Sequence, residues 1–270
     1  CYSKFILIRS EYPSLIRERY WLTKYYKIFV ESWVFKLFDG FVLMTNSLTN
    51  YFMHLSRKNA KFELIPMTVD IERFKGNFFP PFQYPYIAYA GSLSCKKDGV
   101  DILIKAFLRV ASDFPNIHLV IVGDINKTES YEKLRILIEE SNSEFKNRIH
   151  FTGLIDGNLI PTYLKNAEIL ALARPESKQA EGGFPTKLGE YLATGKPVIV
   201  TNVGEILSYL TNKKDAILCV PGSVEDFSEK LSWALQNKEV ASEIGVKGKE
   251  IAYNIFSTKV QGKNLHNFLL

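Results

Sequence analysis

From residue 84 onward, short apolar runs alternate along the chain with stretches whose apolar residues recur at helical spacing. Such runs are typical of strands in a parallel sheet that is covered by helices on both faces. The predicted strands span residues 84–93, 117–124, 148–155, 168–175, 197–203 and 216–222. The predicted helices span residues 100–114, 130–142, 161–167, 187–195, 224–236 and 238–256, and a tail helix ends at Leu270. This order predicts a doubly wound α/β domain over residues 85–256.

The front of the chain shows fewer elements. A helix is predicted over residues 22–38, and strands are predicted over residues 38–46 and 61–70. Residues 77–84 are rich in proline, which continues neither a helix nor a sheet, so they are predicted to link two domains. A complete Rossmann-like unit needs on the order of 100 residues or more. Residues 1–76 are therefore predicted to be the C-terminal part of an incomplete unit of that type.

The composition is that of a folded protein from a reducing compartment. Hydrophobic residues make up 46% of the 270 residues, which is enough for a sizeable core. Cys1, Cys95 and Cys219 form no CxxC pair, so neither a disulfide framework nor a zinc site is expected. The chain opens without Met and without a signal-peptide pattern, and no apolar run reaches the roughly 18 residues of a membrane span. We therefore expect a cytoplasmic protein, and we expect the front of its first domain to be absent from this chain.

The net charge of +5 comes entirely from the front of the chain. Residues 1–76 hold 12 Lys and Arg against 7 Asp and Glu, and they carry 16 of the 36 aromatic residues. Basic and aromatic side chains together suit an anionic membrane surface or a lipid-linked substrate. A helix that packs its aromatic face on a protein core gives the same pattern, so both interpretations stay open.

The turn after the first strand of the large domain offers groups that suit a diphosphate. Its sequence, AGSLSCKKDG, lacks the GxGxxG fingerprint of a nicotinamide dehydrogenase. Gly91 lets the backbone approach a ligand closely, and Ser92 supplies a hydroxyl. Lys96 and Lys97 precede a helix that is predicted to begin near Val100. Cations, a hydroxyl and the positive end of a helix can together hold a diphosphate, although a lysine pair in a loop is also common as plain surface charge.

A second Gly-rich turn lies between the strand predicted over residues 168–175 and the following helix. Gly182 and Gly183 permit backbone conformations and close contacts that side chains would forbid. The N–H donors expected to face an anion at the helix start are those near Phe184, Thr186 and Lys187. Glu190, whose carboxylate only accepts hydrogen bonds, suits the two vicinal hydroxyls of a ribose. A solvated helix face would explain this glutamate equally well.

The run GGFPTKLGEYLATGKPVIVTNVGE resembles the donor-site motif of the family 4 glycosyltransferases. These are retaining enzymes of the GT-B fold, and many assemble capsules or exopolysaccharides. IPMTVDIERF at residues 65–74, AGSLSCKKDGVDILIKAF at residues 90–107 and LVIVGD are similar to further family blocks and stand in the family's order. The resemblance covers nearly all of residues 65–260. It implies two facing Rossmann-like domains, an acceptor domain and then a donor domain, with residues 257–270 as a tail helix that crosses back to the first.

The resemblance also implies roles for two glutamates. Glu190 matches the glutamate that holds the nucleotide ribose. The family's first glutamate, which is directed at the donor sugar, falls on Gly182. Neighbouring Glu181 is therefore expected to reach the sugar, with Glu176 or the backbone as alternatives.

The diphosphate contacts carry over with changes. Lys97 matches a family cation, whereas Ser92 stands at the usual Arg position, so Lys187 is expected to supply a replacement charge. Pro185 occupies a place where many members offer a glycine N–H. The donor-binding residues implied in this way are Gly91, Ser92, Lys97, Gly183, Phe184, Thr186, Lys187 and Glu190. Glu181 and Lys97 are the residues expected to act in catalysis, without a metal.

The expected function is transfer of a sugar from a nucleoside diphosphate sugar to a saccharide or lipid-linked saccharide. The resemblance implies retention of the anomeric configuration and no cofactor. The expected location is the cytoplasm, with peripheral contact at the inner face of the membrane, and no nucleic-acid partner is expected. Because residues 1–76 are too few for a complete acceptor domain, we expect this chain alone to bind the donor without transferring the sugar.

Two other functions stay open. One is a sugar-nucleotide epimerase of the same fold, which needs acid and base residues that this sequence does not clearly present. The other is a catalytically silent protein of the GT-B fold that binds a nucleotide sugar or only a partner chain. The silent binder stays open because the first glutamate of the motif is displaced to Glu181.

Overall fold

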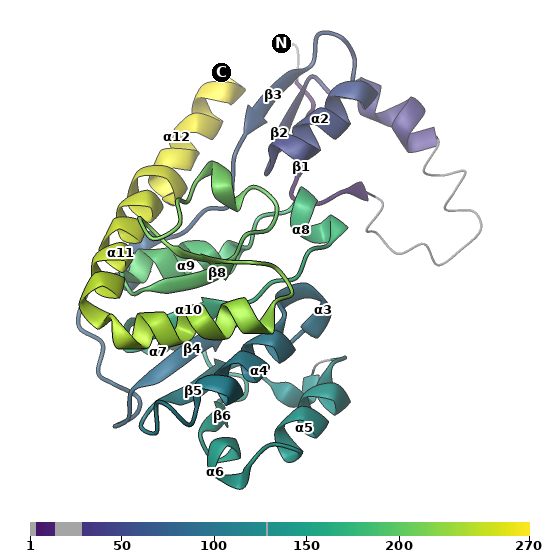
Figure 1. Cartoon of the computed structure of the whole chain (residues 1–270). Helices are drawn as coiled ribbons and strands as arrows, with labels where there is room; N and C mark the ends of the chain where they lie inside the picture. The colour runs from purple at the N-terminus through teal and green to yellow at the C-terminus, as the bar shows by residue number, and fades with distance from the viewer. Residues whose placement is uncertain (1–3, 14–28, 128) are drawn as a thin grey trace.

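The chain folds into a larger and a smaller body, each built on its own parallel sheet (Figure 1). The structure is a computed structural model and describes residues 4–13, 29–127 and 129–270. The predicted α/β architecture with parallel sheets is confirmed. The domain boundaries predicted above stay a proposal.

The larger sheet has the strand order β6-β5-β4-β7-β8-β9. Its strands are β4 (Tyr86–Ala90), β5 (His118–Val122), β6 (Ile149–Phe151), β7 (Ile169–Leu172), β8 (Val198–Thr201) and β9 (Ile217–Cys219). Each lies inside an apolar run that predicted it, because strands buried on both faces need continuous rather than alternating apolar residues. Counted along the chain, the order is 3-2-1-4-5-6, so the direction of winding reverses between β4 and β7.

Helices cover both faces of this sheet (Figure 1). The helices that follow β4 along the chain are α3 (Cys95–Asp98), α4 (Val100–Val110), α5 (Tyr131–Glu139), α6 (Ser143–Lys146), α7 (Ile160–Lys165), α8 (Lys178–Gly182), α9 (Thr186–Thr194), α10 (Val224–Gln236), α11 (Lys238–Ile251) and α12 (Thr258–Leu269). Helix α4 packs against α10 and α5, whereas α9 packs against α11 and α7. Within the described ranges, no helix combines the length and the apolar character that crossing a bilayer requires.

The smaller sheet consists of β1 (Ile6–Arg9), β2 (Gly40–Leu43) and β3 (Lys61–Leu64), all parallel. Helix α2 (Asn46–Leu55) packs on it through Leu48 and Phe52, which are fully buried. The aromatic rings of Phe41 and Phe62 stack with their centroids 5.2 Å apart in the same core. Strand β1 and helix α2 are elements that the sequence analysis did not predict.

Two predictions for the front of the chain need qualification. Residues 22–28 of the helix predicted over 22–38 lie outside the described residues, and the described part ends in a 3-10 turn at Val34–Leu37. The strand predicted over residues 61–70 is shorter, because β3 ends at Leu64 and the chain then leaves the sheet.

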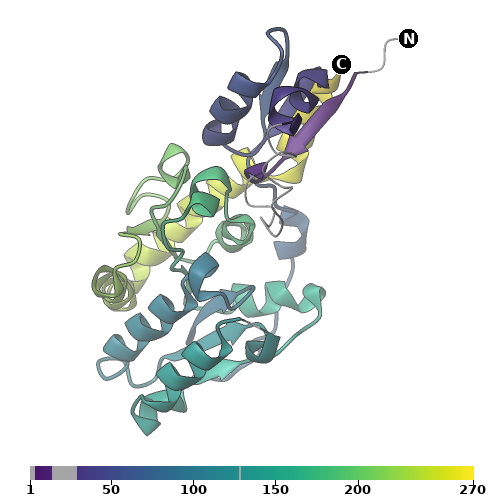
Figure 2. The same cartoon turned by 90° about the vertical axis from the view of Figure 1, so that its right-hand side faces the viewer.

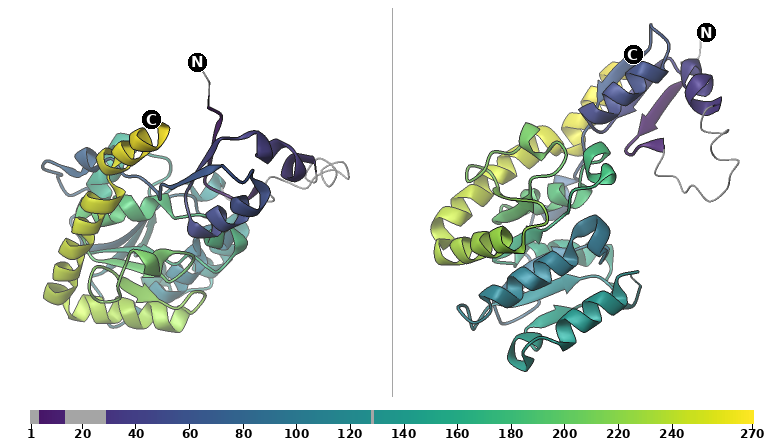
Figure 3. Two further views of the ribbon diagram at one scale, coloured as in Figure 1. Left: turned by 90° about the horizontal axis from the view of Figure 1, so that it is seen from above. Right: turned by 45° about the vertical axis from the view of Figure 1, so that its right-hand side comes forward.

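Two backbone crossings join the bodies and are hydrogen-bonded to each other. The Val69 N–H donates to the carbonyl of Phe256 at 2.8 Å, and the Thr258 N–H donates to the carbonyl of Val69 at 3.0 Å. The helix predicted over residues 238–256 is interrupted here by a π-helical turn at Ala252–Phe256, after which α12 starts anew. Figures 2 and 3 show α12, in yellow, extending from the larger body to the smaller one.

The predicted linker, residues 77–84, does not simply span a gap. Its Tyr84 ring stacks on the His118 ring with the centroids 3.8 Å apart, and Phe82 stacks in turn on Tyr84. His118 Nδ1 and His150 Nε2 share a hydrogen bond of 2.8 Å. These rings lie at the N-terminal edge of the larger sheet, where β5 begins, and they hold the start of β4 in place.

Acid is expected to destabilise the protein through this histidine pair. Burial lowers the pKa of His118 and of His150 in the folded state below the value of about 6.5 that holds in unfolded chains. Between the two pKa values the unfolded chain binds more protons, so the free energy of unfolding should fall as the pH drops below about 6.5. Urea unfolding between about pH 7.5 and 5.5 measures this slope.

The variant His150→Phe tests the assignment, because it removes one titrating ring and keeps the aromatic packing. Its slope should be shallower than that of the wild type. His54→Phe, at an exposed position on α2, is the matched control and should keep the full slope. An unchanged slope in His150→Phe would contradict the assignment.

Candidate functional site

Two turns meet at the carboxyl edge of the larger sheet, where the strand order reverses. One turn, residues 91–99, follows β4, and the other, residues 173–185, follows β7. In doubly wound sheets this reversal point is where ligands bind. Gly99 (φ +65°) lies against the second turn so closely that a Cβ atom there would collide with the carbonyl of Ala173. Only glycine satisfies both the left-handed backbone and this contact.

A buried ion pair connects the first turn with helix α9. Lys187 Nζ lies 3.0 Å from Asp98 Oδ2, and the side chains are 16% and 2% exposed. The same carboxylate oxygen accepts a hydrogen bond of 2.8 Å from the Ser92 hydroxyl, and Lys187 donates to the Tyr89 hydroxyl at 2.8 Å. Burial lowers the pKa of Lys187, and the charge of Asp98 offsets part of that shift.

The Lys187 ammonium lies directly beside the backbone of the first turn. Gly91 has φ +147°, and a Cβ atom there would collide with Lys187 Nζ. Burial also raises the pKa of the neighbouring Tyr89, whose hydroxyl donates to the Ser92 carbonyl. The site therefore presents a cation next to two exposed residues, Gly91 and Ser92, although the Gly91 N–H donates to the Val122 carbonyl at 3.0 Å.

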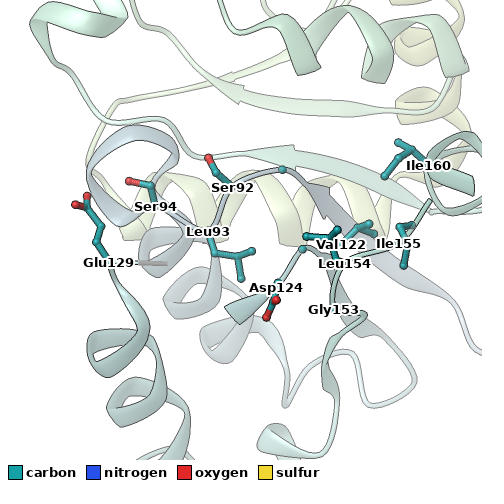
Figure 4. Close-up of a pocket in the computed structure, with 12 residues that line it drawn as sticks. Ser92, Leu93, Ser94, Val122, Asp124, Glu129, Gly153, Leu154, Ile155 and Ile160 are labelled. Carbon is teal, nitrogen blue, oxygen red and sulfur yellow. The ribbon is translucent and has the colours of Figure 1, made fainter. Parts of the chain in front are cut away.

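A cavity of about 490 Å³ opens next to this turn (Figure 4). It lies at the ends of β4, β5 and β6. Its lining residues are Gly91, Ser92, Leu93, Ser94, Val122, Gly123, Asp124, Glu129, Gly153, Leu154, Ile155 and Ile160. In Figure 4, Leu93, Val122 and Leu154 supply apolar walls, while the Ser92 and Ser94 hydroxyls lie along one rim. The cavity suits a planar or partly apolar group joined to an anion.

The predicted first-turn residues lie together. Gly91 and Ser92 line the cavity, and Lys187 lies against Gly91. Lys97 is exposed on the short helix α3, and its charge contributes to lowering the pKa of Lys187, so both cations act on the same region. Thr186 is exposed as the first residue of α9.

The structure corrects the role expected for two backbone donors of the second turn. The Gly183 N–H donates to the Gln179 carbonyl at 3.1 Å, and the Phe184 N–H donates to the Met44 sulfur at 3.2 Å. Pro185 has no N–H. These positions thus offer no free donor, because the turn uses its N–H groups for its own helix and for contact with the smaller body.

The second turn docks on the smaller body. The Thr45 hydroxyl donates to the Gly182 carbonyl at 3.0 Å, and a Cβ atom on Gly182 would lie 2.5 Å from the Tyr12 ring. Glu181 is exposed beside this contact. Burial of Tyr12 raises the pKa of its hydroxyl, and the negative charge of Glu181 raises it further. Glu181 therefore lies beside the contact between the second turn and the smaller body. Glu176, the alternative, is exposed as well.

Glu190 has a partner that the sequence analysis missed. Arg73 Nη1 lies 2.7 Å from Glu190 Oε1, and Arg73 Nη2 donates to the Gly157 carbonyl at 2.8 Å. Arg73 belongs to the block IPMTVDIERF, so the family motif marked its position, but no local pattern connects it with α9.

Two further charged residues of the site were not predicted. Asp98 stands in the turn sequence KKDG, where it reads as a surface residue, yet it is 2% exposed. Arg174 is buried just after β7 and donates to the Gln179 carbonyl at 3.2 Å. Its Nε has no hydrogen-bond partner in the part of the chain that the structure describes. Burial lowers the pKa of Arg174, whereas Asp98 and Glu11 raise it.

Curated relatives are similar to this chain at low sequence identity. An uncharacterized glycosyltransferase, YqgM of Bacillus subtilis, is 21% identical over 230 residues, which are 85% of this chain and 60% of YqgM. The capsular polysaccharide biosynthesis glycosyltransferase CapM of Staphylococcus aureus is 22% identical over 181 residues, which are 67% of this chain and 44% of CapM. The chain thus spans about half of the length of these relatives.

The fold is that of known glycosyltransferase structures. HepE of Anabaena, solved in complex with UDP, superposes with a TM-score of 0.80 at 17% identity, covering 98% of this chain and 72% of HepE. The sequence profile of the family described as "Glycosyl transferases group 1" matches residues 70–251, which include both turns, the cavity and α9. The chain belongs to the group 1 glycosyl transferases.

Proposed function

We propose that this chain forms the donor side of a retaining glycosyltransferase, which moves a sugar from a nucleoside diphosphate sugar to a saccharide or lipid-linked saccharide. One observation carries the proposal. The cation Lys187, which is 16% exposed, lies against Gly91, and Gly91 lines a cavity of about 490 Å³ at the reversal point of the sheet. An anion held at Lys187 can extend its attached base into that cavity.

The leaving group decides what the site must do. In the reaction, the bond between the anomeric carbon and the β-phosphate oxygen breaks, and the diphosphate leaves with the bonding electrons. The acceptor hydroxyl oxygen bonds to that carbon and its proton is released. Fixed positive groups stabilise the charge that grows on the diphosphate. Lys187, Lys97 and the N–H groups at the start of α9 are the groups we assign to this task, and buried Arg174 adds positive charge nearby.

Sugar and ribose are assigned to different carboxylates. The Glu190 carboxylate accepts hydrogen bonds from the ribose hydroxyls. Glu181 faces the donor sugar from its place beside the contact between the two bodies. The HepE structures support a donor of this class, because they were solved with UDP, with UDP and glucose, and with UDP-glucose. CapM, by its name, acts in capsular polysaccharide biosynthesis, which supports a saccharide acceptor.

Contact with a membrane surface is a further part of this proposal. Phe29, Trp33 and Leu37 are 58%, 69% and 68% exposed, and they follow one another at helical spacing. The excess positive charge of residues 1–76 would attract an anionic surface. Much of that basic and aromatic stretch, residues 14–28, lies outside the described residues.

The decisive experiment is thermal unfolding in the presence of UDP-, GDP- and ADP-sugars. A ligand that binds only the folded state raises the melting temperature by mass action. One nucleotide class should stabilise the chain strongly, and hydrolysis or transfer of that donor would then separate an enzyme from a silent binder. Absence of stabilisation by every donor would refute the proposal.

Glu190→Ala should weaken binding of the preferred nucleoside diphosphate. Two ribose hydroxyls would lose a charged acceptor, which costs about 1–3 kcal/mol, or roughly a tenfold to hundredfold loss of affinity. Glu190→Gln should also weaken binding, because the amide replaces one acceptor oxygen with a donor. Calorimetric titration measures both variants. Wild-type affinity in Glu190→Ala would contradict the ribose assignment and would mean that Glu190 only forms part of a solvated helix face.

Glu181→Ala should discriminate between two ligands. Binding of the bare nucleoside diphosphate should stay within about twofold of wild type, whereas the sugar-bearing donor should bind about tenfold more weakly, because only the sugar hydroxyls lose an acceptor. Glu176→Ala, in the same turn, is the matched control. Equal losses for both ligands in Glu181→Ala would place Glu181 at the nucleotide, and the sugar-specific loss in Glu176→Ala would assign the role to Glu176.

Lys187→Met should reduce affinity for the diphosphate about tenfold, and the loss should shrink at high salt. It should also lower the free energy of unfolding by about 3 kcal/mol, because Asp98 stays buried without its partner. The double variant Asp98→Asn/Lys187→Met separates the two effects. It should recover much of the stability, measured by urea unfolding, but not the affinity. Wild-type affinity in the double variant would show that Lys187 serves only Asp98.

A further inference from the structure

Arg73 connects three parts of the chain through one guanidinium group. It lies in the crossing that leads from the smaller to the larger body, within the 3-10 turn Ile71–Phe74. One nitrogen pairs with Glu190 on α9 at 2.7 Å, and another donates to the Gly157 carbonyl at 2.8 Å. Planar guanidinium groups bridge two acceptors in a fixed arrangement, which an ammonium group does not.

Neither acceptor lines the cavity itself, but both belong to parts of the chain that we assign to the nucleotide site. Gly157 lies in the segment between β6 and α7 that also supplies Gly153, Leu154 and Ile155 to the cavity. Glu190 is the carboxylate assigned to the ribose. Arg73 therefore holds a side of the cavity and the ribose acceptor at a set distance from each other.

The backbone of Arg73 is itself held firmly. Asp70 Oδ1 accepts from the Glu72 N–H at 3.1 Å and caps the turn, and the Phe74 side chain is buried. Val69 pairs with the returning crossing at Phe256 and Thr258. The guanidinium group thus extends from a fixed base toward α9.

The exposure of the pair indicates orientation rather than stability. The Arg73 and Glu190 side chains are 36% and 28% exposed, and ion pairs this open to water contribute little to folding. The contact uses Oε1 of Glu190, and Oε2 has no hydrogen-bond partner among the described residues. A carboxylate fixed through one oxygen presents the other in a defined direction to a ligand.

We propose that Arg73 is a positioning residue of the nucleotide site, which orients the Glu190 carboxylate toward the ribose and fixes it relative to the segment around Gly157 that also supplies the cavity wall. The inference rests on the proposed function of Glu190. It assigns to the crossing segment a share in ribose recognition, although Arg73 itself need not touch the ligand.

The test compares ribose with deoxyribose ligands. The wild type is titrated with UDP, GDP and ADP and with the 2′-deoxy form of each, and the best-bound pair is then used for all variants. We expect the wild type to prefer the ribose form about tenfold, and Arg73→Ala to lose most of that preference, while its affinity for the deoxy form stays within about twofold. Arg73→Lys should not restore the preference, because lysine cannot bridge both acceptors.

Lys75→Ala is the matched control, because Lys75 lies in the same crossing and pairs with exposed Glu72 outside the site. It should keep the ribose preference. Arg73→Gln, which retains an amide donor without the charge, serves if Arg73→Ala does not fold, and it should also lose most of the preference. The melting temperature of each variant without ligand reports its folding.

Each contrary result of this test identifies the assignment that is wrong. Full ribose preference in the folded Arg73 variants overturns the inference. An equal loss of affinity for the ribose and the deoxy forms overturns it as well, because it would mean that the contact is merely structural. Full ribose preference in Glu190→Ala overturns the assignment of the ribose to Glu190 and the inference with it. No binding of any nucleoside diphosphate by the wild type overturns the proposed function itself.

Discussion

The buried charge of Asp98 is the constraint around which the site is built. A carboxylate that is 2% exposed needs a compensating cation and hydrogen-bond donors, and Lys187 and Ser92 supply them. To reach Asp98, Lys187 at the start of α9 lies against the β4 turn at Gly91, where a φ of +147° favours glycine. The Tyr191 hydroxyl, which accepts from the Ala90 N–H at 2.7 Å, secures the same approach one helical turn further along.

A second set of contacts connects this centre with the smaller body. Glu205 accepts from the Ser47 N–H at 3.1 Å and from the Asn46 side chain at 3.2 Å, so a carboxylate of the larger body satisfies the start of α2. Together with the Thr45–Gly182 hydrogen bond, this contact determines which way the second turn faces. Glu181 therefore lies beside a contact between the bodies, and the Gly183 and Phe184 N–H groups of the turn donate to the Gln179 carbonyl and to the Met44 sulfur.

The crossings add a connection on the other side of α9. Their mutual hydrogen bonds at Val69 fix the short turn that carries Arg73, and Arg73 contacts Glu190. Helix α9 is thus attached to the β4 turn through Lys187 and to the crossing through Glu190, and these two residues are three positions apart in sequence. A change in the angle between the two bodies would act on the nucleotide site through this helix, because packed elements shift as units rather than deform continuously.

The sequence by itself determined the strands of the larger sheet, its longer helices and the two turns, because apolar periodicity and glycine positions are local properties of the chain. It also placed Gly91, Ser92 and Lys187 in one site through motif order. It did not reveal β1 or α2, whose short patterns are weak without their partners. Only the tertiary structure decided that Glu190 pairs with Arg73, 117 residues away, and that the Phe184 N–H serves Met44, 140 residues away. Such partners are chosen by the packing of distant segments, which no local pattern of residue types encodes.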